Sequence, residues 1–175
     1  EAIKNKTFAL ELTKKVYSED SPEYVSLLDQ LSISYSNAGN DTMAIRLGTK
    51  VLEIRKKSLT ETSSEYAKAL SQLAMLYYRA AYSGHDDYYP EAIKLQKTAV
   101  EILSNNATED EKNDTIYRWC SVLGAALVDL AAIYNDSGNP AEAIKCQTLA
   151  IEHEQLYLGH NIDFSVMYGE TLADL

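Results

Sequence analysis

Apolar side chains recur at spacings of three and four residues along most of the chain. Leu28, Leu31 and Tyr35 form one such series, and they fall on a single stripe when the segment is wound as an α-helix. Only seven Gly and three Pro interrupt the pattern in 175 residues, which leaves little material for turns. The pattern predicts eight helices, at residues 1–18, 22–38, 41–58, 63–82, 89–105, 109–136, 140–157 and 163–175.

The predicted helices repeat in pairs. When the chain is shifted by 42 residues, so that Ala2 lies over Ala44, 16 of the 37 positions from Ala2 to Ala38 carry the same residue. The register continues if about six residues are inserted near 83–89 and about nine between 102 and 123. The first series then returns twice, as Leu70, Leu73 and Tyr77 and as Leu127, Leu130 and Tyr134. Such a period indicates units of two helices that bury their apolar faces by stacking on one another.

Residues typical of helix ends mark several boundaries. Ser21 followed by Pro22 predicts a helix start, with the serine as the N-cap and the proline in the first turn. Gly39 and Gly138 are placed just beyond helix ends, where a positive φ favours glycine. The sequence Thr-Glu-Asp-Glu at 108–111 has the form of a capping box, and it predicts that the nine extra residues lengthen the sixth helix at its start.

These repeated residues resemble the tetratricopeptide repeat. The Leu-x-x-Leu-Ser/Ala-x-x-Tyr series of each first helix, with Ala44, Ala92 or Ala143 in the second, carries the resemblance, and the 42-residue period and the junction at 61–66 are similar to the kinesin light chain type. The resemblance implies an all-α fold, a right-handed α-solenoid of antiparallel helix pairs. It divides the single array 1–175 into a half repeat (1–20), repeats at 21–62, 63–107 and 108–160, and a half repeat (161–175). An aromatic residue of the pattern is replaced at three positions, Gly48, Gln96 and Gln147.

The resemblance also implies a function. Arrays of this family bind a peptide or protein segment in a concave groove formed mainly by first helices, so we expect a protein–protein interaction module. Side-chain amides such as Gln30 and Gln72 donate and accept hydrogen bonds, which suits an extended peptide backbone. The repeat register places twelve residues in the groove: Asp29, Gln30, Ile33, Asn37, Lys68, Ser71, Gln72, Met75, Tyr78, Arg79, Asp129 and Asn135. Chaperone-binding members carry a basic clamp where this chain has Asp29 and Ile33, which argues against recognition of a chaperone tail.

The residues leave other roles open. A polar row on a solenoid can be a solvated surface, and the array can be a structural spacer. It can also be a ligand- or peptide-sensing regulatory segment of a larger signalling or transcription-control protein, which flanking domains would decide. Tyr88, Tyr89 and Trp119 lie off the regular register, where they either pack on neighbouring helices or contact a partner.

Composition excludes several function classes. Sixteen basic residues against 26 acidic ones give a net charge of -10, which argues against a nucleic-acid partner and favours a basic or neutral ligand. No apolar run reaches about 18 residues, so no membrane span is expected. No nucleophile–base pattern, phosphate loop or metal-ligand spacing is present, so we expect neither an enzyme nor a cofactor. His85, Asp86 and Asp87 are consecutive in a predicted loop and are interpreted as hydrated surface rather than a metal site.

Two further expectations concern the surroundings of the chain. The two cysteines form no disulfide pattern, and no secretory leader is visible in the sequence. Both observations favour the cytoplasm weakly, so the compartment stays open. The outermost half repeats lack polar caps, which predicts exposed apolar residues, among them Leu10, Leu12 and Leu172, and end-to-end self-association.

Overall fold

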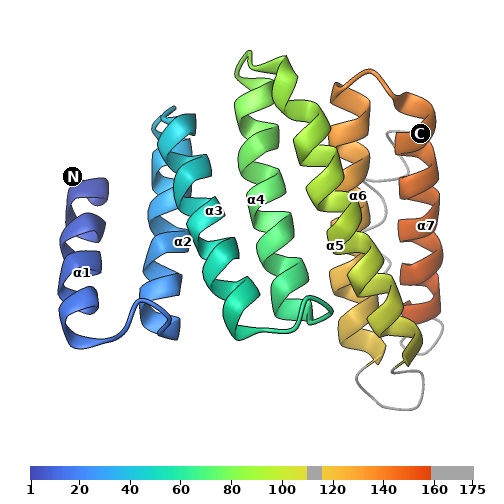
Figure 1. The fold of residues 1–175 in the computed structure, drawn as a ribbon. Helices are drawn as coiled ribbons and strands as arrows, with labels where there is room; N and C mark the ends of the chain where they lie inside the picture. The colour runs from blue at the N-terminus through green and yellow to red at the C-terminus, as the bar shows by residue number, and fades with distance from the viewer. Residues whose placement is uncertain (110–115, 159–175) are drawn as a thin grey trace.

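The computed structural model describes residues 1–109 and 116–158, and every regular element in these ranges is helical. Consecutive helices run antiparallel and form a single row from α1 to α7 (Figure 1). The elements are α1 (Ala2–Val16), α2 (Pro22–Asn37), α3 (Asp41–Ser58), α4 (Ser64–Tyr82), the short 3-10 helix η1 (Asp86–Tyr88), α5 (Tyr89–Glu109), α6 (Ile116–Asp136) and α7 (Pro140–Leu158). The predicted all-α solenoid of helix pairs is confirmed, and the helix predicted at 163–175 lies outside the described residues.

Side-chain caps fix where the helices begin. The Ser21 hydroxyl accepts a hydrogen bond from the Tyr24 backbone N–H at 3.2 Å, and Pro22 opens α2 as predicted. Ser63 caps α4 in the same way, through the Tyr66 N–H at 3.2 Å. The repeated Ser-x-x-Tyr spacing therefore satisfies one of the backbone donors that a helix start leaves without a partner.

Glycines end two of the first helices. Gly39 has φ +73° after α2 and Gly138 has φ +81° after α6, a region that other residues rarely adopt. Both positions were predicted from the sequence.

The boundary between α5 and α6 differs from the prediction. The sixth helix was expected to begin at 109, yet α5 continues to Glu109 and contains Thr108, so the capping-box interpretation is wrong. The last turns of α5 are held from outside the helix, because the Asn106 side-chain amide donates to the Thr62 carbonyl at 2.9 Å. The nine extra residues therefore extend the fifth helix as well.

The apolar core runs along the whole row of helices. The stripe leucines Leu28, Leu70 and Leu127 are at most 4% exposed. The small residues of the second helices, Ala44, Ala92 and Ala143, are buried as well. Each pair of helices thus packs on its neighbours, as expected for a solenoid.

The departures from the repeat pattern have local explanations. A Cβ added at Gly48 would lie 2.7 Å from Cδ1 of Leu76 and 3.0 Å from Cδ1 of Leu73, so no aromatic side chain fits where α3 crosses α4. Gln96 is fully buried in α5, and its amide donates to the Ala126 carbonyl of α6 at 2.9 Å. A hydrogen bond between helices therefore replaces an aromatic contact at that position.

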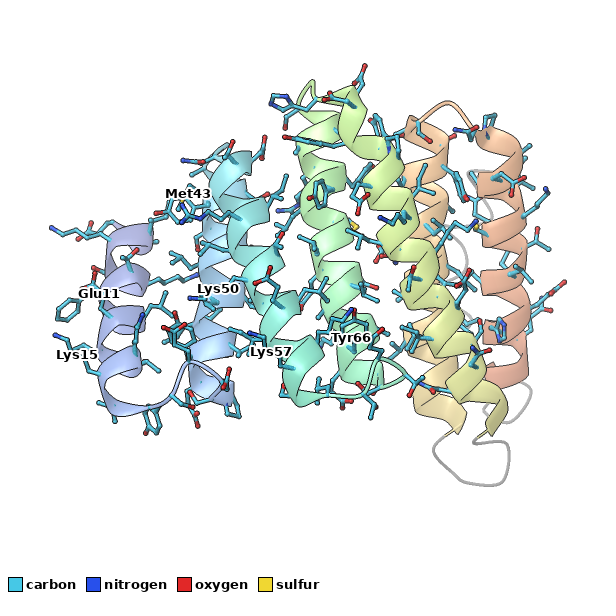
Figure 2. All side chains as sticks on the ribbon, viewed as in Figure 1. Glu11, Lys15, Met43, Lys50, Lys57 and Tyr66 are labelled. Carbon is cyan, nitrogen blue, oxygen red and sulfur yellow. The ribbon has the colours of Figure 1, made fainter. Side chains whose placement is uncertain are left out.

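One face of α1 is uncovered. Phe8, Leu12 and Val16, spaced four apart, are 61%, 45% and 72% exposed. Ile54, which occupies the place of Leu12 in the next unit, is only 7% exposed because it packs in the cluster around Leu28. On α1, Glu11 and Lys15 point away from the row (Figure 2). Leu10 is not exposed as predicted, because it packs partly buried against the same cluster, and Leu172 lies outside the described residues.

Candidate peptide-binding groove

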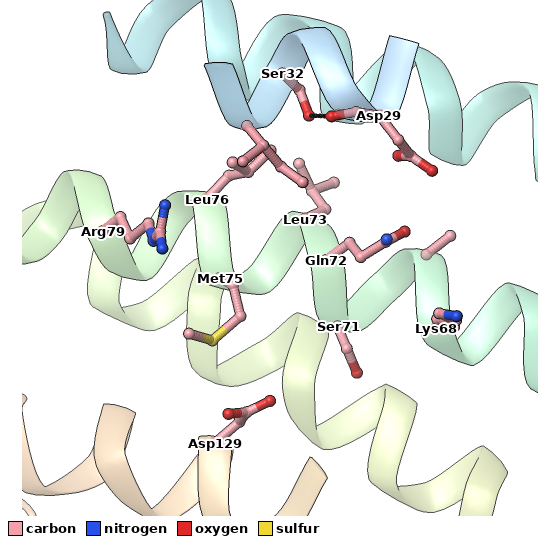
Figure 3. Close-up of a pocket in the computed structure, with 13 residues that line it drawn as sticks. Asp29, Ser32, Lys68, Ser71, Gln72, Leu73, Met75, Leu76, Arg79 and Asp129 are labelled. Carbon is pink, nitrogen blue, oxygen red and sulfur yellow. Dashed lines mark hydrogen bonds between the residues drawn. The ribbon is translucent and has the colours of Figure 1, made fainter. Parts of the chain in front are cut away.

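The first helices of successive units form one face of the solenoid. α2 contacts α4, and α4 contacts α6, although a second helix separates each pair in the sequence. Figure 3 shows a pocket between them, with Asp29 contributed by α2, Gln72 by α4 and Asp129 by α6. Residues of three successive units therefore meet at one place.

This pocket has a volume of about 310 Å³. Small or apolar side chains, among them Ala69, Leu73 and Leu76, form part of its wall. Eight of the twelve residues predicted for the groove line it: Asp29, Ile33, Lys68, Ser71, Gln72, Met75, Arg79 and Asp129. The volume is at the lower end of the range found for ligand sites, which is enough for a side chain or a short peptide segment.

A second hollow, of about 580 Å³, adjoins the first. It contains Gln30, together with Ser26 of α2 and Val122 of α6. Both hollows include Asp29, Ile33, Lys68 and Gln72, so they are neighbouring parts of one depression, which we call the groove.

The other three predicted residues, Asn37, Tyr78 and Asn135, lie near the C-terminal ends of the first helices and line neither hollow. Arg79 Nη1 donates to Asn37 Oδ1 at 2.9 Å, which joins α4 to α2. The Tyr78 hydroxyl donates to Asp136 Oδ2 at 2.6 Å, which joins α4 to α6, and Asn135 donates to the other oxygen of Asp136 at 3.5 Å. These side chains connect the units at the end of the groove.

Arg55 was not predicted from the sequence, because it belongs to a second helix. Its guanidinium lies 3.3 Å from a carboxylate oxygen of Asp29, and both side chains are mostly buried. Burial nevertheless raises the pKa of Asp29, outweighing the opposite effects of Arg55 and Lys68. The pair therefore neutralises the Asp29 carboxylate, and Arg55 also lines the adjoining hollow.

Gln72 and Asp129 each place an acceptor in the groove that has no partner in the described part of the chain. The Gln72 Oε1 atom is buried and accepts no hydrogen bond there. Asp129 is half-buried, forms no ion pair among the described residues, and has a pKa raised by burial alone. A buried acceptor and a desolvated carboxylate are both stabilised when a donor or a cation reaches them.

The described residues contain no group of three His, Cys, Asp or Glu placed to hold a metal ion. Within residues 1–109 and 116–158, no helix combines the length and the apolar character needed to cross a bilayer.

Two solved structures share this arrangement. The crystal structure of BtubC (BKLC) from P. vanneervenii superimposes with a TM-score of 0.73 and 20% sequence identity, covering 93% of this chain and 59% of that one. A crystal structure of a putative kinesin light chain from Podosopora anserina, with nearly identical TPR-like repeats, gives a TM-score of 0.54 and 15% identity over 88% of this chain and 85% of the other. The chain is a tetratricopeptide-like α-solenoid.

No family model and no curated protein matches the sequence. At 15–20% sequence identity, the two solved structures establish the fold of the chain and nothing more. The chain spans 59% of the length of BtubC.

Proposed function

We propose that this TPR-like solenoid binds an extended peptide, or an extended segment of a protein, in the groove formed by α2, α4 and α6. The observation that carries the proposal is the pocket that three successive units build together, with an unpaired acceptor at Gln72 and an uncompensated carboxylate at Asp129 in the described part of the chain.

The groove offers a peptide two kinds of contact. Gln72 lines the pocket with a side-chain amide, a group that pairs with peptide N–H and C=O groups independently of the peptide's sequence. Asp129 selects a segment with a basic side chain, whose aliphatic stem packs on Ile33 and Met75. The net charge of -10 favours the approach of such a ligand over long range.

Selection from a displayed library of random peptides tests the proposal. A synthetic copy of an enriched peptide is titrated into the wild-type chain and into the double variant Gln30→Ala, Gln72→Ala. Each lost hydrogen bond weakens binding by about 0.5–1.5 kcal/mol, so we expect a loss of about 1–3 kcal/mol for the double variant. Gln155→Ala, at an exposed amide on α7 that lines neither hollow, is the matched control and should bind as the wild type does.

Replacing Gln30 and Gln72 by alanine should leave the fold unchanged, because neither side chain is fully buried. Unaltered circular dichroism of the double variant verifies this. Equal affinity of the wild type and the double variant for every enriched peptide would show that the groove is not the binding surface.

A further inference from the structure

The insertion between α4 and α5 gathers tyrosine rings at the end of the groove. Tyr78 and Tyr82 lie one turn apart on α4, with ring centroids 6.4 Å apart, and Tyr89 at the start of α5 places its ring 6.4 Å from that of Tyr78. We call these three residues the tyrosine cluster. Tyr82 is 74% exposed, so a large aromatic face is open to solvent.

Carboxylates surround this cluster. A hollow of about 390 Å³ lies beside it, lined by Asp86, Tyr89 and Asp136 together with Pro90, Ile93, Ser137 and Asn139. Asp86 and Asp136 are near enough to Tyr89 to raise the pKa of its phenol, after the larger effect of burial. The loop after α4 and the turn after α6 both lie along the same edge of the row, at the top in Figure 1, so residues distant in the sequence meet here.

The placement of Asp136 is unusual for a purely structural acid. Asp86 and Asp87 precede α5, where a negative charge stabilises a helix start, and they need no further explanation. Asp136 is the last residue of α6, at the negative end of the helix dipole, and the last turn of α6 holds no basic residue. Among the described residues its hydrogen-bond donors are Tyr78 and Asn135, which are neutral and leave its charge uncompensated.

No Lys or Arg of the described chain neutralises this region. The ion pairs formed by residues 1–109 and 116–158 include neither Asp86, Asp87 nor Asp136. Arg79, the basic residue in the last turn of α4, donates instead to Asn37. The Tyr89 ring shares this hollow with Asp86 and Asp136, and an aromatic ring beside carboxylates forms a site for a cation.

We propose that the tyrosine cluster, Asp86 and Asp136 form a binding site for the guanidinium of an arginine side chain on a partner protein. Arginine fits better than lysine, because its planar group stacks on a tyrosine ring while its N–H groups bond carboxylates from two sides. The site lies outside the groove lining and does not depend on the groove proposal. The insertion supplies Asp86 and Tyr89, and Tyr78 and Tyr82 of α4 and Asp136 of α6 complete the site.

Titration with a minimal probe tests the site. The acetylated, amidated tripeptide Gly-Arg-Gly is added to the chain while the ring signals of isotope-labelled tyrosines are followed by NMR. The same tripeptide with citrulline, a neutral isostere of arginine, is the ligand control. We expect saturable shifts of the Tyr78, Tyr82 and Tyr89 rings with the arginine peptide and none with the citrulline peptide.

Two variants place the binding on named groups. Tyr82→Leu removes an exposed ring and Asp86→Asn removes one charge, and each should weaken the arginine tripeptide about two- to fivefold. Tyr17→Leu and Asp20→Asn make the same changes at exposed positions near α1 and should leave its affinity unchanged. An equal response to the citrulline peptide, the absence of saturable shifts at the cluster, or unchanged affinity in both cluster variants would overturn the proposal.

Discussion

Two glycines in helix interiors offer a matched test of the packing between units. Gly48 lies in α3 and Gly124 in α6, and alanine is favoured over glycine by about 1 kcal/mol in a helix interior. At Gly124 no atom of the described residues lies within 4 Å of an added Cβ, apart from its own helix backbone and chain neighbours. Gly124→Ala should therefore raise the free energy of unfolding by about 0.5–1 kcal/mol.

Gly48→Ala should behave differently. The new methyl group would lie 2.7 Å from Leu76 Cδ1, closer than real contacts allow, and 3.0 Å from Leu73 Cδ1, tighter than most real contacts. Overpacking of a tight contact reduces stability by about 1–3 kcal/mol, which offsets or exceeds the helix-propensity gain. For Gly48→Ala we expect a free energy of unfolding between that of the wild type and about 2 kcal/mol less. This value is at least about 0.5 kcal/mol lower than the one expected for Gly124→Ala.

Urea denaturation followed by circular dichroism measures both variants under the same conditions. The cause is tested by making Gly48→Ala in a chain that already carries Leu76→Ala. Because Leu76→Ala removes the nearest clashing methyl group, Gly48→Ala should stabilise that chain. If Gly48→Ala stabilises the chain as much as Gly124→Ala, the close crossing of α3 and α4 is wrong.

Burial, charge and exposure elsewhere in the row give three more expected outcomes. Ala92→Leu, at a fully buried position of α5, should lower the free energy of unfolding by about 1–3 kcal/mol, and a neutral result in denaturation would contradict the packing of α5 on its neighbours. The raised pKa of Asp129 means that this carboxylate binds a proton more readily in the folded state than in the unfolded state. The free energy of unfolding of the wild type should therefore rise as the pH falls toward the usual pKa of an aspartate. Asp129→Asn should thus be more stable than wild type at neutral pH, with a gap that narrows on acidification, and a pH-independent gap would refute this reasoning. The uncovered face of α1 should mediate self-association at high concentration, and the double variant Phe8→Glu, Leu12→Glu should shift sedimentation toward the monomer, whereas an unchanged profile would exclude this face.

The helices could be predicted because local and repeated signals agree. In each unit the leucine stripe, the small residue of the second helix and the turn residues point to the same pair of helices, and the structure follows them. The α5–α6 boundary could not be predicted, because a capping-box sequence is a local signal. The Asn106 contact that helps hold the end of α5 reaches a carbonyl at Thr62, 44 residues away.

The groove was predictable to the extent that the repeat register describes it. Gln72 and Asp129 line one pocket because equivalent positions of stacked units meet. Arg55 was missed because the register gives its place on a second helix and does not show that its long side chain reaches Asp29. The link between Tyr78 and Asp136 joins residues 58 apart, so only the stacking of α4 and α6 reveals that carboxylates surround the tyrosine cluster.

Photo-cross-linking tests the central claim, that α2, α4 and α6 form the peptide-binding surface, most directly. A library-selected peptide carries benzoylphenylalanine, which reacts preferentially with methionine, and the cross-linked residue is identified by mass spectrometry. Two methionines of similar, partial burial serve as reporters: Met75 in the groove and Met43 on α3, which lines a different hollow. We predict cross-links to Met75 that the double variant Gln30→Ala, Gln72→Ala reduces. Cross-links to Met43, with none to Met75, would contradict the claim.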